Sequence, residues 1–227
     1  MLQVGLTGLS GKKMSITIPD SFDYMILATV RAGTHWLASR LSSHPDLDNF
    51  GELGCKNYPE WMGMRKDSGG LHGFIAHYKD CSTANEDEAL LEFYMLHLGR
   101  RPVIHLVRDP ESSARSIVAN AVVMNGLKEQ GIDPADDYVS HHKGDEEKES
   151  VEVDPKLVAM MEEKNRLHQE AFRDLLLKNN PQHIEVRYED MKKDAESTDL
   201  RILEFLGVKP MKLTSALVPT RRLVTVS

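Results

Sequence analysis

The sequence predicts an α/β fold with a mostly parallel sheet, because short apolar runs alternate with segments of helical periodicity. Two continuous apolar runs, Tyr24–Val30 and Pro102–Val107, have the length and composition of strands that are buried on both faces. Each run is followed by a turn and then by apolar residues at helical spacing. A strand, a turn and a helix in this order form half of a βαβ unit, and repeated units build a parallel sheet covered by helices.

The composition is typical of one globular domain, and we expect a single domain over residues 1–227. Of the 227 residues, 41% are hydrophobic and 28% are charged, close to the globular average. Lys plus Arg number 28 and Asp plus Glu 35, which gives a formal net charge of −7. This balance argues against nucleic acid or an anionic membrane as a general partner, so an anionic ligand would need a local basic pocket. The sequence has no transmembrane run, no signal-peptide core and only two cysteines, which predicts a soluble cytoplasmic protein.

The other elements are expected in order along the chain. A β-prone stretch, Met14–Ile18, comes early, and Asn49–Gly70 is rich in turn formers and is expected to be irregular. Six later segments have helix or strand patterns: a strand at Leu71–Tyr78, a helix at Glu86–Leu98, a helix from Pro110 to about Met124, a helix at Pro155–Lys178, a strand at His183–Tyr188 and a helix at Thr198–Leu206. Residues 126–154 contain the charged run GDEEKE, which predicts an exposed, flexible insertion.

The turn after the first apolar run has the composition of an anion-binding loop. This turn, residues 31–36, reads Arg-Ala-Gly-Thr-His-Trp and leads into a helix. A helix N-terminus presents backbone N–H groups and the positive end of a dipole. Gly33 lets the backbone approach a ligand closely, Thr34 adds a hydroxyl and Arg31 adds a cation. Together they predict a phosphate or sulfate site, with an ordinary β-α turn as the alternative.

A second motif follows the other apolar run. Arg108-Asp109-Pro110 lies at the carboxyl edge of that strand, where open α/β sheets bind ligands. Ser116 lies eight residues after Arg108, a little over two helical turns, so it can return to the same edge. A guanidinium and a hydroxyl suit a second phosphate. The alternative is a helix-capping Asp109 beside a surface arginine.

Taken together, in this order and 77 residues apart, the two motifs resemble the sulfotransferases that use 3′-phosphoadenosine 5′-phosphosulfate (PAPS). The family's 5′-phosphosulfate loop is matched at Arg31, Gly33, Thr34 and Trp36, whereas Val30, Ala32 and His35 replace its Pro, Ser and Thr/Ser. Its 3′-phosphate site is matched at Arg108 and Ser116. Two later segments, Arg187–Met191 and Ile202–Val208, are similar to its Tyr-Glu-Asp-Leu strand end and its Phe-Leu-Gly helix end.

The resemblance implies a three-layer α/β/α fold with a central mostly parallel sheet, like that of P-loop NTPases. It also implies an enzyme that moves a sulfuryl group from PAPS to a hydroxyl or amine of a small-molecule or carbohydrate acceptor. The released product is adenosine 3′,5′-bisphosphate (PAP), and no metal is required. Residues 31–36 together with Arg108 and Ser116 are then the donor-binding set, and Arg31 also acts on the bridging oxygen. The C-terminal pair Arg221-Arg222 is a further candidate, since family members use a basic loop there.

Two residues are candidates for the general base. His44-Pro45-Asp46 followed by Gly51-Glu52 is similar to carbohydrate-type members, in which such a segment leads to a glutamate near the acceptor; this favours Glu52. His77 ends a predicted strand and resembles the histidine base of cytosolic members. Each has an alternative without a role in catalysis, as a solvated carboxylate or a strand-end histidine. Trp36 either stacks near the adenine or packs beneath the loop, and His105 is expected in the core.

Two other functions are compatible with the sequence. The departures at Val30, Ala32 and His35 allow a degenerate member that holds a nucleotide or a sulfated ligand without turnover. The run Gly5–Lys12 resembles the phosphate-binding P-loop of a kinase. Its two glycines are one residue too far apart, however, and Lys13 replaces the required Ser or Thr.

Overall fold

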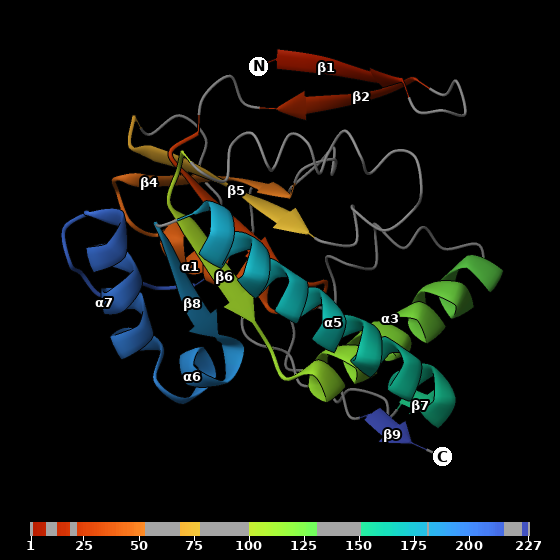
Figure 1. Ribbon diagram of the computed structural model, residues 1–227. Coiled ribbons are helices and arrows are strands. Elements are labelled where there is room, and N and C mark those ends of the chain that lie inside the picture. The colour runs from red at the N-terminus through yellow and green to blue at the C-terminus, as the bar shows by residue number, and fades with distance from the viewer. Residues whose placement is uncertain are drawn as a thin grey trace.

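The centre of the molecule is a five-stranded parallel sheet of order β4-β5-β3-β6-β8 (Figure 1). The structure is a computed structural model that describes residues 2–7, 13–18, 22–52, 69–77, 100–130, 151–180, 182–215 and 224–226. The strands of the sheet are β3 (Tyr24–Ala28), β4 (Leu47–Glu52), β5 (Leu71–His77), β6 (Val103–Val107) and β8 (His183–Arg187). The parallel sheet and the α/β class predicted from the sequence are confirmed.

Helices cover both faces of this sheet and make three layers (Figure 1). The helices are α1 (Thr34–Leu41), α3 (Pro110–Glu129), α5 (Pro155–Asn179), α6 (Tyr188–Lys193) and α7 (Ala195–Leu206). Alternate residues of β3, Tyr24 and Ile26, pack with α1 and α7 in the main core cluster. On the opposite face, Phe172 of α5 lies edge-on to His105 of β6, with 5.9 Å between ring centroids. His105 is therefore a core residue, as predicted.

The strand order places a ligand-binding edge between β3 and β6. From β3 the chain moves to β4 and β5 on one side, and then crosses to β6 and β8 on the other. In open parallel sheets, ligands bind outside the carboxyl ends of the strands where this direction reverses. The turn after β3 and the Arg108 corner after β6 lie at this point.

Four elements differ from the expectation. Strand β4 extends into the segment 49–70 that was expected to be irregular, because pairing with β5 overrides local turn preference. Tyr24 Oη also donates to the carbonyl of Asp48 at 3.0 Å. Helix α3 extends to Glu129, since one glycine costs a helix only about 1 kcal/mol. Helix α6 follows β8 directly and was not predicted, and α7 begins at Ala195, capped by Asp194, whose carboxylate accepts from Ser197 N at 3.0 Å. The predicted helix at 86–98 lies outside the described residues.

Two small sheets lie apart from the central one. Strands β1 (Leu2–Thr7) and β2 (Lys13–Ile18) form an antiparallel pair. A kinase P-loop leads from a strand into a helix, whereas here Lys13 begins a strand, so the kinase interpretation is wrong. Strands β7 (Val151–Val153) and β9 (Val224–Val226) pair in parallel beside α3. The flexible insertion predicted at 126–154 stays a prediction; its residues 131–150 lie outside the described part. Within the described residues, no helix has the length and apolar character needed to span a bilayer.

Candidate functional site

The turn between β3 and α1 has a backbone shape that few residues adopt. Arg31 has φ of 64° and Gly33 has φ of 96°, both in the left-handed region. For a non-glycine residue this conformation costs about 1–2 kcal/mol, and such strain tends to collect at functional sites. Gly33 is the N-cap of α1, and this end of the helix has no side-chain cap and no acidic residue in its first turn. The positive end of the α1 dipole therefore faces the turn, and the helix's own first turn contributes no carboxylate to neutralise it.

Three contacts join this turn to the second motif. Arg108 Nη1 donates to the carbonyl oxygen of Arg31 at 2.8 Å. Arg31 Nε donates to Ser116 Oγ at 3.2 Å, and Ser113 Oγ donates to the carbonyl of Val30 at 3.0 Å. Residues 85 positions apart thus meet at one edge of the sheet. The predicted juxtaposition of the two motifs is present in the fold.

The ring of Tyr188 contacts both motifs. The guanidinium carbon of Arg108 lies 4.6 Å from the ring centroid of Tyr188, a cation–π distance. The same ring packs against Gly33: a Cβ added there would lie 2.5 Å from Tyr188 Cδ2. The rings of Trp36 and Tyr188 make an edge-to-face contact with 5.9 Å between their centroids. On Trp36 itself, the guanidinium carbon of Arg40 lies 5.8 Å from the ring centroid. Trp36 therefore packs within the protein beneath the turn, as the second of its two predicted roles requires.

Both candidate bases lie at the carboxyl edge of the sheet, but at different distances from the turn. His77 pairs with Ala28 at the end of β5, is buried, and has its Nδ1 at 3.4 Å from the Ala28 carbonyl oxygen. Glu52 ends β4, where its backbone pairs with Ile75, and β4 is two strands away from β3. The side chain of Glu52 lies outside the described part of the chain, as do Arg221 and Arg222.

Comparison with known proteins identifies the family. The model of the sulfotransferase domain family matches residues 21–218. The chain belongs to the sulfotransferase domain family. The match includes the turn, the Arg108 corner and the β8–α6 segment, all of which the motifs had indicated. No curated protein matches the sequence.

Solved sulfotransferase structures are similar in fold and distant in sequence. A sulfotransferase from Alicyclobacillus acidocaldarius is 13% identical with a TM-score of 0.51, and the match covers 89% of this chain and 87% of that one. A mouse sulfotransferase complexed with PAP is 17% identical, with a TM-score of 0.44 and coverage of 84% and 60%. A sulfotransferase domain from the curacin biosynthetic pathway is 14% identical, with a TM-score of 0.49 and coverage of 83% and 74%. The first of these shows the shared sulfotransferase fold.

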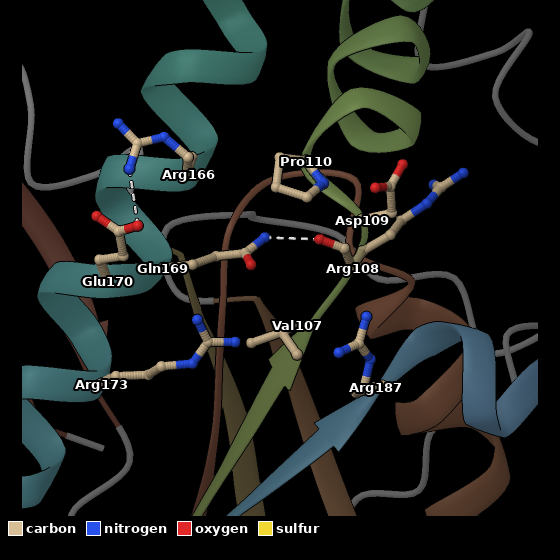
Figure 2. Close-up of a pocket in the computed structure, with 9 residues that line it drawn as sticks. All are labelled: Val107, Arg108, Asp109, Pro110, Arg166, Gln169, Glu170, Arg173 and Arg187. Carbon is tan, nitrogen blue, oxygen red and sulfur yellow. Dashed lines mark hydrogen bonds and ion pairs between the residues drawn. The ribbon is translucent and has the colours of Figure 1, made fainter.

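An arginine-lined pocket of about 200 Å³ at the ends of β6 and β8 borders the second motif, because Arg108, Asp109 and Pro110 are among the residues that line it (Figure 2). Two of its arginines are neutralised by carboxylates. Arg166 bonds Glu163 at 2.7 Å and Glu170 at 2.8 Å, and Arg173 bonds Glu185 at 2.6 Å. The pocket therefore offers an anion much less positive charge than its arginine content suggests. Among the described residues, no group of three or more His, Cys, Asp or Glu could hold a metal ion.

Four side chains that support the site were not predicted from the sequence. Tyr188 and Glu189 lie in a segment read only as a family motif, and Ser113 lies in α3 next to the predicted ligand positions. Gln169 was missed as well, although a signal for it exists. It is a polar residue on the face of α5 that buries Val158, Phe172 and Leu176. A polar residue at a buried helical position usually has a specific hydrogen-bond partner.

Proposed function

We propose that the protein transfers a sulfuryl group from PAPS to a hydroxyl or amine of a small-molecule or carbohydrate acceptor and releases PAP. The observation that carries this proposal is the joining of the turn and the Arg108 corner by the Arg108–Arg31 and Arg31–Ser116 hydrogen bonds. Two cationic, hydroxyl-bearing segments side by side suit one ligand with anionic groups at both ends. Family membership supports the same activity.

The residues at the site fit such a donor. Arg108 Nε is buried and has no hydrogen-bond partner, so this N–H group can gain one when an anion binds. The first turn of α1 contains no acidic residue, and Gly33 gives the turn its left-handed backbone at φ of 96°. We assign the 5′ end of the donor to residues 31–36 and the 3′-phosphate to Arg108 and Ser116. Arg221 and Arg222 stay candidates: Ser215, before them, bonds Ser39 of α1 at 3.1 Å, and Val224, after them, pairs with β7.

Bound PAPS would supply an activated sulfuryl group whose leaving group is a phosphate. The protein's part is positioning and charge stabilisation, as in phosphoryl transfer. Arg31 and the α1 dipole place positive charge where negative charge grows on the leaving oxygen. A base must take the acceptor's proton as the acceptor oxygen or nitrogen forms its bond to sulfur and the bond from sulfur to the leaving phosphate oxygen breaks.

We propose His77 as the first candidate for that base, with Glu52 as the alternative. His77 lies one strand from β3 at the level of Ala28, three residues before Arg31. Its contact with the Ala28 carbonyl orients the imidazole beside the turn. Glu52 lies a further strand away, at the carboxyl end of β4, and a carboxylate at that position suits an acceptor that binds across the end of β5.

The second candidate function is a binding module of the same fold, and His35 in place of a hydroxyl residue is the observation that favours it. The test is incubation of the purified protein with PAPS and a panel of hydroxyl and amine acceptors, with PAP release as the readout. Turnover that disappears in Arg31→Ala supports the enzyme. Binding of PAP without turnover on any acceptor supports the module, and no binding of either nucleotide rejects both. The cytoplasmic location also stays a prediction.

A further inference from the structure

One peptide group at the donor edge is held by side chains on both of its polar atoms. The carbonyl oxygen of Arg108 accepts from Gln169 Nε2 at 2.7 Å, as Figure 2 shows. The N–H of Asp109, which belongs to the same peptide group, donates to Glu189 Oε1 at 3.0 Å. Gln169 comes from α5 and Glu189 from α6, on opposite sides of the chain at this corner.

This pair of contacts fixes the backbone on the C-terminal side of Arg108. On the N-terminal side the backbone is already held, because Val107 pairs with Arg187 in the sheet. Asp109 then caps α3, its carboxylate accepting from Ser112 N at 2.8 Å. The backbone of Arg108 is thus held on both sides, by sheet pairing before it and by the two side chains and the helix cap after it. This fixes the direction in which its Cα–Cβ bond points.

We infer that Gln169 and Glu189 are positioning residues for Arg108, and this inference rests on the proposed function. A guanidinium lies about 6 Å from its own Cα, so a backbone rotation of about 10° moves it by about 1 Å. Displacements of that size are enough to weaken a charge-assisted hydrogen bond to a phosphate. Gln169 is only 5% exposed, so its amide has no role on the surface and its bond to the Arg108 carbonyl accounts for its presence in the core.

We call the two hydrogen bonds from Gln169 to the Arg108 carbonyl and from the Asp109 N–H to Glu189 the clamp. Binding of the 5′ end of the donor depends less on this clamp than binding of the 3′-phosphate. Residues 31–36 form the turn after β3 and the first residues of α1. One bond, from Arg108 Nη1 to the Arg31 carbonyl, links this turn to Arg108. Two others do not involve the Arg108 peptide: Ser113 Oγ donates to the Val30 carbonyl, and Leu37 N donates to the Gly33 carbonyl. Loosening the clamp therefore acts mainly on the 3′-phosphate. A purely structural role for Gln169 and Glu189 would weaken binding of both ends equally.

The test is calorimetry with two probes, PAP and adenosine 5′-monophosphate, which differ in the 3′-phosphate. We expect Gln169→Met and Glu189→Leu to weaken PAP binding about ten-fold, about the worth of one hydrogen bond to a charged group. Affinity for adenosine 5′-monophosphate should change by less than about two-fold, since its contacts lie in the turn. Glu189→Gln should keep wild-type PAP affinity, because its amide oxygen can accept the same bond and Oε2 has no hydrogen-bond partner to lose.

Two controls make the outcome decisive. Gln182→Met changes an exposed glutamine and should alter neither affinity. In an Arg108→Ala background, Gln169→Met should cause no further loss of PAP affinity, because the clamp acts through Arg108. Equal losses for both probes, or unchanged PAP affinity in both clamp variants, would overturn the inference. A wild-type protein that binds PAP no better than adenosine 5′-monophosphate would instead reject the proposed function.

Discussion

Replacing Gly33 by alanine tests whether the turn between β3 and α1 packs against the ring of Tyr188. The added Cβ would lie 2.5 Å from Tyr188 Cδ2 and 2.7 Å from Cε2, well inside contact distance. The ring cannot simply retreat, because Arg108 stacks on it and Trp36 meets its edge. The residue also has φ of 96°, a conformation that L side chains rarely adopt.

The left-handed backbone and the clash with Tyr188 each lower the free energy of unfolding of Gly33→Ala. The left-handed backbone costs about 1–2 kcal/mol for a residue with a Cβ, and a clash within a packed site costs about 1–3 kcal/mol more. We therefore expect Gly33→Ala to lower the free energy of unfolding by about 3 kcal/mol. For a chain of this size, that corresponds to a fall in Tm of about 10 °C.

Gly207→Ala is the matched control. Gly207 has φ of 71°, and an added Cβ there meets nothing within 4 Å, so only the backbone effect applies. We expect a loss of about 1 kcal/mol in urea unfolding. In a Tyr188→Ala background, Gly33→Ala should likewise cost only about 1 kcal/mol, because the ring is gone. If Gly33→Ala and Gly207→Ala cost the same in the wild-type background, the packing of Tyr188 under the turn is refuted.

Three further predictions concern other parts of the structure. Arg40→Met should destabilise the fold by about 3 kcal/mol in urea unfolding, because it leaves buried Asp199 without its bidentate partner. A double variant, Arg40→Met with Asp199→Leu, should recover most of that loss, because no unpaired charge is then buried. A double variant as unstable as Arg40→Met would contradict this. A hydrogen bond from His105, together with Arg173, lowers the pKa of Glu185 from 4.5 to about 2, so its stabilisation is present above about pH 4.5 and is lost as the pH falls through about 2. The stability difference between wild type and Glu185→Gln should then shrink over that range, and a difference that stays constant with pH argues against it. His77→Gln should lower kcat by at least about 100-fold with nearly unchanged PAP affinity; wild-type turnover there, with loss in Glu52→Gln, transfers the base role to Glu52.

The parts of the fold that could be predicted are those with local apolar patterns. Strands β3 and β6 are short, mostly apolar runs that are buried throughout, so their composition alone indicates strands inside a sheet. Strand β4 contains Asp48 and Asn49, which read as turn formers. Both are buried inside the fold. The hydroxyl of Tyr24 donates to the main-chain carbonyl of Asp48, and Asn49 Oδ1 accepts from Gly51 N. No pattern along the chain contains that information.

The same distinction holds for the candidate site. The meeting of Arg31 with Ser116 follows from a general rule, since carboxyl ends of parallel strands share one edge. The position of the Tyr188 ring against Gly33 depends on how α6 packs after β8. Helix α6 is short, and the sequence did not predict it. The bond from Gln169 to the Arg108 carbonyl depends on the rotation of α5 about its own axis. These supporting contacts are tertiary, so the sequence predicted which candidate residues meet at this edge but not the side chains that hold them there.

A crystal structure of the protein with PAP tests the central claim most directly. The account predicts the 5′-phosphate within hydrogen-bond distance of the backbone N–H groups at the start of α1 and the 3′-phosphate on Arg108 and Ser116. A nucleotide bound away from both motifs, or bound with only one of its two phosphates at this edge, would contradict it.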